Sequence, residues 1–286
     1  MIRLFPKTRN FAILASLLWV VAVVVGRLTV FDEYKSAISG ILSPLIAALC
    51  GVYIIYAFAS IQASRMHRAY NAILSDECDA DRYVALYEEV RERGRANRRT
   101  VFLTESSYAT GLHLTGRSDE AREIVRALTQ RPDFARQRAV DRADAYVDIG
   151  IYSVSLGDLP AAREAITEAE AILSSMMVGT QEYSRIYREV TRLRHRADIA
   201  DGIYGEALEY FTDTSREYTV PYTKVNRMNT LADIYRATGD GEQLRKCLSY
   251  VARHGGTLYM AKKAREELEA LGELGELGEG TQGGTS

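Results

Sequence analysis

Two long apolar stretches without charge open the chain. The first covers residues 10–26, with the core FAILASLLWVVAVVV, and is followed by Arg27 and a few more apolar residues; the second covers residues 36–64. A helix that crosses a bilayer needs about 20 mostly apolar residues. The first stretch reaches this length if Arg27 extends its charged end to the interface. The pattern therefore predicts a transmembrane hairpin over residues 1–64, with helices at about 10–31 and 37–62.

The distribution of Lys and Arg predicts the orientation of this hairpin. Such residues favour the cytoplasmic side of membrane helices, and only Arg27 and Lys35 lie at the linker between the two helices, whereas the outer ends carry Arg3, Lys7, Arg9, Arg65 and Arg68. We therefore expect a multi-pass protein of the cell membrane, with the N-terminus and the C-terminal domain in the cytoplasm. The alternative is a cleaved signal peptide, but no small-x-small cleavage site precedes Arg27.

Beyond residue 64, apolar positions recur among polar ones at the spacing of amphipathic helices. Within residues 81–93, for example, Tyr83, Tyr87 and Val90 fall on one helical face. Alternating runs typical of strands are few, and there is no Asn-Gly hairpin turn. The predicted organisation is linking helices at 65–97, helical repeats at 98–256, a capping helix at 257–271 and a glycine-rich disordered tail at 272–286.

The evidence for repeats is a turn that recurs along the sequence. An amphipathic helix reaches a glycine and a second helix starts two to four residues later, at Gly116, Gly157, Gly202 and Gly239. Glycine accepts the backbone angles of such a turn, and a small residue is needed where two helices cross closely. The small positions of the second helices hold Ala121, Ala162 and Ala207.

This pattern resembles the tetratricopeptide repeat (TPR), although the glycines are 41, 45 and 37 residues apart and the family's usual period is about 34 residues. Leu244 and His195 occupy positions where the family has a small residue. The resemblance implies an all-α fold class: a TPR-like α-α repeat solenoid, here placed after the transmembrane hairpin. It also implies that the concave face of the array binds a peptide or protein.

Four arginines on one predicted helix form the most specific feature of the repeats. Arg185, Arg188, Arg192 and Arg196 are three, four and four residues apart, which places them in one narrow stripe, about 120° from the apolar stripe of the same helix. A guanidinium matches a carboxylate as a rigid fork. The stripe indicates a basic groove for an acidic peptide or a terminal carboxylate; the alternative is a solvated face paired with Glu189, Asp198 or Asp201.

The resemblance assigns further residues to the concave face. The first helices of TPR pairs line that face, so Arg192 and Arg196 belong to it. The fourth unit adds Asn226, Asn229, Asp233 and Arg236; the second adds Asp144, Val147, Ile151 and Val154; the first adds Ser106, Thr110 and His113.

Composition and motifs narrow the function classes. The net charge of -2 argues against a nucleic-acid binder. Cys50, Cys78 and Cys247 form neither a disulfide framework nor a zinc spacing and suit a reducing compartment. Motifs for metal-binding histidine pairs, phosphate loops and nucleophile elbows are absent from the sequence. The sequence therefore predicts no enzyme, no cofactor, no metal and no small-molecule substrate.

These patterns predict a membrane-anchored cytoplasmic scaffold that binds a peptide or protein partner through the concave face of its array. The alternative is a non-catalytic structural or assembly subunit of a membrane protein complex, recognised through its transmembrane hairpin, where small residues such as Ala47 and Gly51 allow close helix packing.

Overall fold

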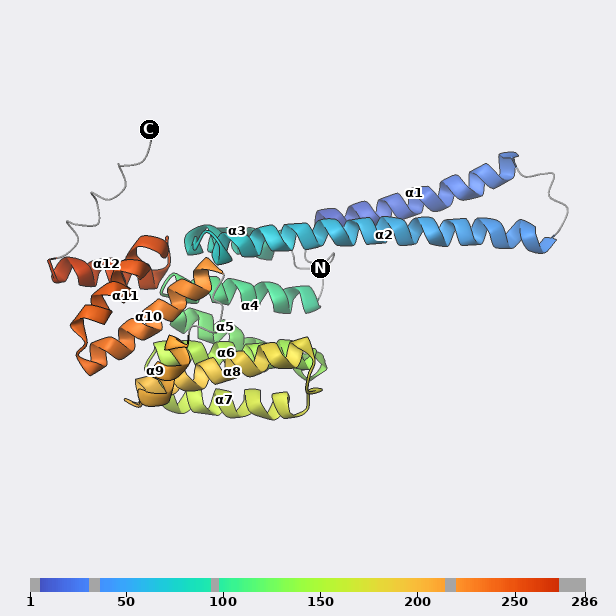
Figure 1. Cartoon of the computed structure of the whole chain (residues 1–286). Coiled ribbons are helices and arrows are strands. Elements are labelled where there is room, and N and C mark those ends of the chain that lie inside the picture. Colours follow the sequence, from blue (N-terminus) through green and yellow to red (C-terminus); the bar gives the residue numbers. More distant parts are fainter. Residues whose placement is uncertain (1–5, 31–36, 94–97, 214–219, 273–286) are drawn as a thin grey trace, which may run out of the picture. The chain divides into compact units, whose positions relative to one another are not determined.

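The computed structural model describes residues 6–30, 37–93, 98–213 and 220–272, and in the first two helices it describes only part of the side chains. Within these ranges the chain is helical and contains no strand, which confirms the all-α class (Figure 1). The predicted linker at 32–35 and nearly all of the predicted disordered tail lie outside the described residues.

The helices follow one another along the chain with short connections. They are α1 (Pro6–Val30), α2 (Ala37–Ser75), α3 (Ala80–Arg93), α4 (Arg98–Leu114), α5 (Ser118–Thr129), the 3₁₀ helix η2 (Phe134–Arg136), α6 (Ala139–Ser155), α7 (Leu159–Ser174), α8 (Gln181–Ala200), α9 (Gly205–Thr212), α10 (Pro221–Thr238), α11 (Gly241–His254) and α12 (Tyr259–Ala270).

The chain divides into two compact units. The first comprises Met1–Asn71 with Glu89–Val101, and the second comprises Ala72–Glu88 with Phe102–Ser286. In the first unit, α1 packs on α2 through the Trp19 indole, whose Nε1 donates a hydrogen bond to the Ala47 carbonyl oxygen at 3.1 Å. Gly51 lies directly under the same ring, and a methyl group at that position would overlap the indole.

The prediction of a transmembrane hairpin is corrected by the structure. Among the residues that it describes, no helix combines the length and the apolar character that a membrane crossing requires. The expected multi-pass membrane localisation is contradicted by the same finding.

The second unit consists of successive helix pairs, and glycine makes the turn within each pair. Gly116, Gly157, Gly202 and Gly239 all have φ between 74° and 96°, a region that glycine enters at little cost. After two of these turns an aspartate caps the next helix: the side chains of Asp158 and Asp240 accept hydrogen bonds from backbone N–H groups in the first turn. The local sequence thus both ends one helix and starts the next.

Two apolar clusters hold these pairs together. One lies between α6, α7 and α8 and includes Ile186, Val190 and Leu193, all buried. The other lies among α9 to α12 and includes Phe211 and Leu248. Small residues lie where helices approach closely: Ala162, Ala197 and Ala207 have almost no exposed surface.

The start of the second unit is joined to its last helix pair by a set of hydrogen bonds that we call the clasp. Thr257, in the turn before α12, donates its backbone N–H to the Cys78 carbonyl oxygen at 3.2 Å. Its hydroxyl donates to Asp79 Oδ1 at 3.0 Å and accepts from the Asp81 N–H at 3.2 Å. Cys78 itself is buried and has φ of 53°. The adjacent Gly256 allows the two backbone segments to approach, because a Cβ at that position would lie 2.6 Å from the Cys78 carbonyl oxygen.

Replacing Gly256 with alanine tests the clasp. Gly256→Ala introduces both a strained positive φ and a backbone overlap, whereas Gly179→Ala introduces only the strain, because nothing lies within 4 Å of a Cβ at that position. We expect Gly179→Ala to lower the free energy of unfolding by about 1 kcal/mol and Gly256→Ala to lower it by at least about 2 kcal/mol more, measured by urea denaturation. Equal losses would show that the clasp contributes no close packing.

Candidate functional site

Three neighbouring helices of the second unit carry polar stripes, which together we call the inner face. Residues three and four apart on a helix share one side. α6 packs against α8, and α8 also contacts α10 (Figure 1). The inner face comprises Asp144, Asp148 and Tyr152 on α6, Arg185, Glu189, Arg192 and Arg196 on α8, and Tyr222, Asn226, Asn229, Asp233 and Arg236 on α10.

Three of the predicted arginines form ion pairs. Arg185 holds Asp144 of α6 through two hydrogen bonds of 2.8 and 2.7 Å. Arg192 donates to Glu189 on its own helix at 2.9 Å. Arg236 pairs with Asp233 at 2.7 Å and, through two bonds of 2.9 and 2.8 Å, with Glu267 of α12. These ion pairs hold the side chains of Arg185, Arg192 and Arg236 in place on the inner face.

Arg196 differs from these three because it has no carboxylate partner among the described residues. Its Nη2 donates to the Asn226 amide oxygen and, at 3.3 Å, to the Thr230 hydroxyl. The side chain is half-buried, and burial lowers the pKa of its guanidinium. Arg196 is thus a desolvated positive charge that neutral oxygens hold in place.

Of the other predicted residues, Val147 is buried in the core between α6 and α8, whereas Arg188 and Asn229 reach the surface. Arg188 is exposed and makes no hydrogen bond or ion pair with a described residue, and Asn229 is half-buried without a hydrogen bond to the described part of the chain. The alternative was a solvated face on which the stripe arginines pair with Glu189, Asp198 or Asp201. Glu189 does pair with Arg192. Asp198 and Asp201 pair with Arg163 of α7 instead of a stripe arginine.

Sequence reasoning missed three members of the inner face, Asp148, Tyr152 and Tyr222. Asp148 is half-buried, and burial together with the charge of Asp144 raises its pKa well above the usual range. Burial also raises the pKa of Tyr222, which interacts electrostatically with both Arg196 and Asp148. The signal was their spacing: each lies four residues from a member of the stripe on its own helix, Asp148 after Asp144, Tyr152 after Asp148, and Tyr222 before Asn226.

His113 of α4 borders the inner face and is held neutral. Its ring packs against the Tyr152 ring at 4.8 Å between centroids, and its Nδ1 lies 2.9 Å from the Ser118 hydroxyl. Burial, with a smaller effect of the Arg196 charge, lowers its pKa to about 3. An imidazole with this pKa is a weak general base, so the histidine–serine pair is not an activated nucleophile.

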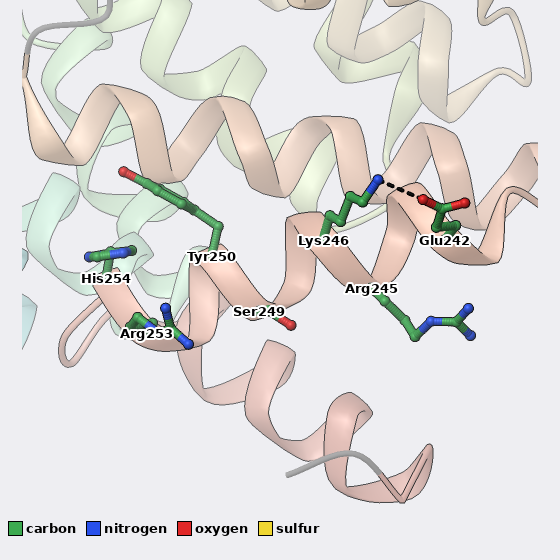
Figure 2. Close-up of a pocket in the computed structure, with 7 residues that line it drawn as sticks. All are labelled: Glu242, Arg245, Lys246, Ser249, Tyr250, Arg253 and His254. Atoms are coloured by element: carbon green, nitrogen blue, oxygen red, sulfur yellow. Dashed lines mark hydrogen bonds and ion pairs between the residues drawn. The ribbon is translucent and has the colours of Figure 1, made fainter. Parts of the chain in front are cut away.

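A second surface lies on the solvent side of α11, where sequence reasoning singled out nothing. Figure 2 shows a shallow depression lined by Glu242, Arg245, Lys246, Ser249, Tyr250, Arg253 and His254. Lys246 is paired with Glu242 at 2.6 Å, His254 packs on the Tyr250 ring at 4.5 Å, and Lys224 of α10 lies 5.0 Å from the centre of that ring. Because a single helix supplies the whole lining, the depression is an open basic surface rather than an enclosed cavity.

Metal binding has no support in the described part of the chain, where no three His, Cys, Asp or Glu side chains are grouped to hold an ion.

Comparison of the chain with protein-family models, with curated proteins and with solved structures finds no match. Function is therefore inferred from the surfaces of the described residues.

The depressed pKa of His113 predicts an acid-sensitive fold. In the unfolded chain a histidine binds its proton near pH 6.5, whereas folded His113 binds it only near pH 3. Its contribution to stability is therefore complete above pH 6.5 and is lost as the pH falls toward 3, by about 1.4 kcal/mol per unit of pKa difference at most. We expect His113→Gln to remove part of the acid-induced fall in unfolding free energy, as measured by urea denaturation at several pH values.

The matched control is His254→Gln, which replaces an exposed histidine. We expect this variant to follow the wild-type profile. A His113→Gln profile parallel to that of the wild type would contradict the assignment of acid sensitivity to His113.

Proposed function

We propose that this protein is a non-catalytic scaffold that binds a peptide segment of a partner protein on the inner face of a TPR-like helical array. The observation that carries this proposal is Arg196, a half-buried guanidinium with no carboxylate partner among the described residues. A charge that is partly removed from water with no carboxylate in direct contact costs stability. Such a cost is typical of a group that serves binding.

The chemistry of the inner face suits a peptide. Arg196 and its neighbour Arg192 supply planar donors for a carboxylate, so we expect the segment to carry an acidic side chain or a terminal carboxylate. The Asn229 amide, which makes no hydrogen bond with a described residue, can both donate to and accept from a peptide backbone. Because Asn226 and Thr230 already position Arg196, little ordering is required when a ligand arrives.

A peptide selection tests this proposal. Short random peptides displayed on phage are selected against the immobilised full-length protein, and the dissociation constants of the enriched sequences are measured by fluorescence anisotropy. We expect Arg196→Gln to weaken binding at least about tenfold, because the acidic group of the peptide loses its partner. The matched control is Arg188→Gln, which removes the same charge from an exposed position on the same helix and should bind as the wild type does.

Two results would contradict the proposal. One is a failure of the selection to enrich any sequence. The other is an equal effect of Arg196→Gln and Arg188→Gln on every enriched peptide. Circular dichroism of each variant establishes that the helices remain folded.

A second candidate function, an assembly subunit recognised through its first helices, is favoured by a different observation. The described parts of α1 and α2 expose many large apolar side chains, among them Leu14, Leu18, Ile54 and Phe58. Exposed apolar surface of this extent marks an interaction site. Here the pair α1–α2 would bind the partner, and the helical array would give the assembly rigidity.

Charged substitutions distinguish this candidate. Ile54 and Phe58 lie one helical turn apart and are 64% and 51% exposed, so Ile54→Lys with Phe58→Lys should dissociate any complex that buries them, since each loses about 1.5–3 kcal/mol of apolar burial. The control is Met177→Lys with Val178→Lys, at exposed positions of the second unit. Mass photometry of the purified native assembly gives the result, and an unchanged mass in the first variant would rule the candidate out.

A further inference from the structure

The exposed side of α11 carries an excess of positive charge. Glu242 is the only acidic residue of this helix, which also carries Arg245, Lys246, Arg253 and His254. All five line the depression shown in Figure 2, which we call the α11 surface. The chain as a whole has a net charge of -2, so the excess is a property of this one surface and not of the composition.

Two arginines of the α11 surface lie on one stripe. Arg245, Ser249 and Arg253 follow one another at intervals of four residues, which places them on the same side of the helix (Figure 2). At a rise of about 1.5 Å per residue, Arg245 and Arg253 are about 12 Å apart along the helix axis. Arg253 is exposed and makes no hydrogen bond or ion pair with a described residue.

The neighbouring lysines add further positive charge that an incoming anion can reach. Lys246 pairs with Glu242 at 2.6 Å, but both side chains are more than half exposed, and a pair of this kind contributes little to stability. Lys224 of α10 is exposed, lies 5.0 Å from the centre of the Tyr250 ring, and has no carboxylate partner among the described residues. The α11 surface can therefore receive an anion without losing an interaction on which the fold depends.

We propose that the α11 surface binds an acidic segment of a partner protein, whose carboxylates pair with Arg245 and Arg253. This site is separate from the inner face and does not depend on the binding proposed there. A guanidinium matches a carboxylate as a rigid fork. An extended chain rises about 3.3 Å per residue and places every second side chain on one side. Two acidic residues four positions apart in such a chain are therefore about 13 Å apart, close to the spacing of the two arginines.

The form of the α11 surface favours a peptide over other anions. A site for a small molecule encloses most of its ligand, whereas a single helix lines this open depression. Single-stranded nucleic acids stack their bases on aromatic rings, but the Tyr250 ring already packs against His254 and lies beside Lys224. A nucleic-acid-binding protein also has a basic excess as a rule, which the net charge of -2 does not provide.

Fluorescence anisotropy with a defined peptide tests this proposal. The probe is a fluorescein-labelled peptide of alternating glutamate and threonine, in which the β-branched threonine favours an extended chain, and it is titrated with the full-length protein. We expect Arg245→Gln with Arg253→Gln to weaken binding at least about tenfold, because two carboxylates of the peptide lose their partners. A peptide in which every glutamate is replaced by glutamine should not bind.

Matched controls separate the α11 surface from the charge of the whole protein and from the inner face. Arg136→Gln with Arg188→Gln removes the same two charges from exposed positions on other elements and should leave the affinity unchanged. Arg196→Gln should also bind the probe as the wild type does. Circular dichroism establishes that each variant remains helical.

The outcomes distinguish this inference from the proposed function. A loss of affinity confined to the α11 variant supports the acidic-segment site, whatever the inner face binds. No binding of the probe, or equal losses in the α11 variant and its matched control, would overturn it. A loss in Arg196→Gln alone would assign the acidic peptide to the inner face, and so would overturn this site while supporting the proposed function.

Other occupants of the α11 surface give results of their own, each of which would overturn the proposal. Tighter binding of an oligothymidylate with the same number of charges would assign the surface to nucleic acid. A dimer of the wild type that the α11 variant abolishes, as measured by mass photometry, would assign it to a second copy of the chain. Tighter peptide binding after Glu273→Gln, Glu276→Gln and Glu279→Gln would assign it to the chain's own acidic residues.

Discussion

The second unit depends on one constraint: an α-helix has a single apolar stripe to bury, and its other sides must be accommodated in water or paired. In α8 the buried stripe of Ile186, Val190 and Leu193 fits against α6 and α7. The arginines then necessarily point to another side, where they meet the polar stripes of α6 and α10. The inner face is thus a direct consequence of how the core is packed.

Ion pairing decides which charges of the inner face remain available. Arg185, Arg192 and Arg236 bind carboxylates within the protein, and these pairs hold neighbouring helices and side chains in register. Arg196 has no carboxylate partner of this kind among the described residues, and neutral oxygens hold its guanidinium instead.

Much of this arrangement was predictable from local patterns. The glycine turns follow from the positive φ that glycine accepts, and the arginine stripe follows from spacing alone. The pairings could not be predicted, because Arg185 and Asp144 are 41 residues apart in sequence, and contacts between helices depend on tertiary packing. Asp148 could have been predicted from its spacing, four residues after Asp144 on the same helix. The transmembrane hairpin was predicted from the length and apolar character of two stretches of sequence, and it is wrong because no described helix combines both to the extent that a membrane crossing requires.

The clasp has a consequence for how the array behaves as a whole. In an open stack of helix pairs each pair contacts only its neighbours, so the ends unravel first and stability is nearly additive along the stack. Here Cys78, Ala80 and Leu114 share an apolar cluster with Leu258 and Leu268, so the beginning of the unit is also part of its end. The described beginning and end of the unit therefore support each other, and its helix pairs should open together rather than fray from one end.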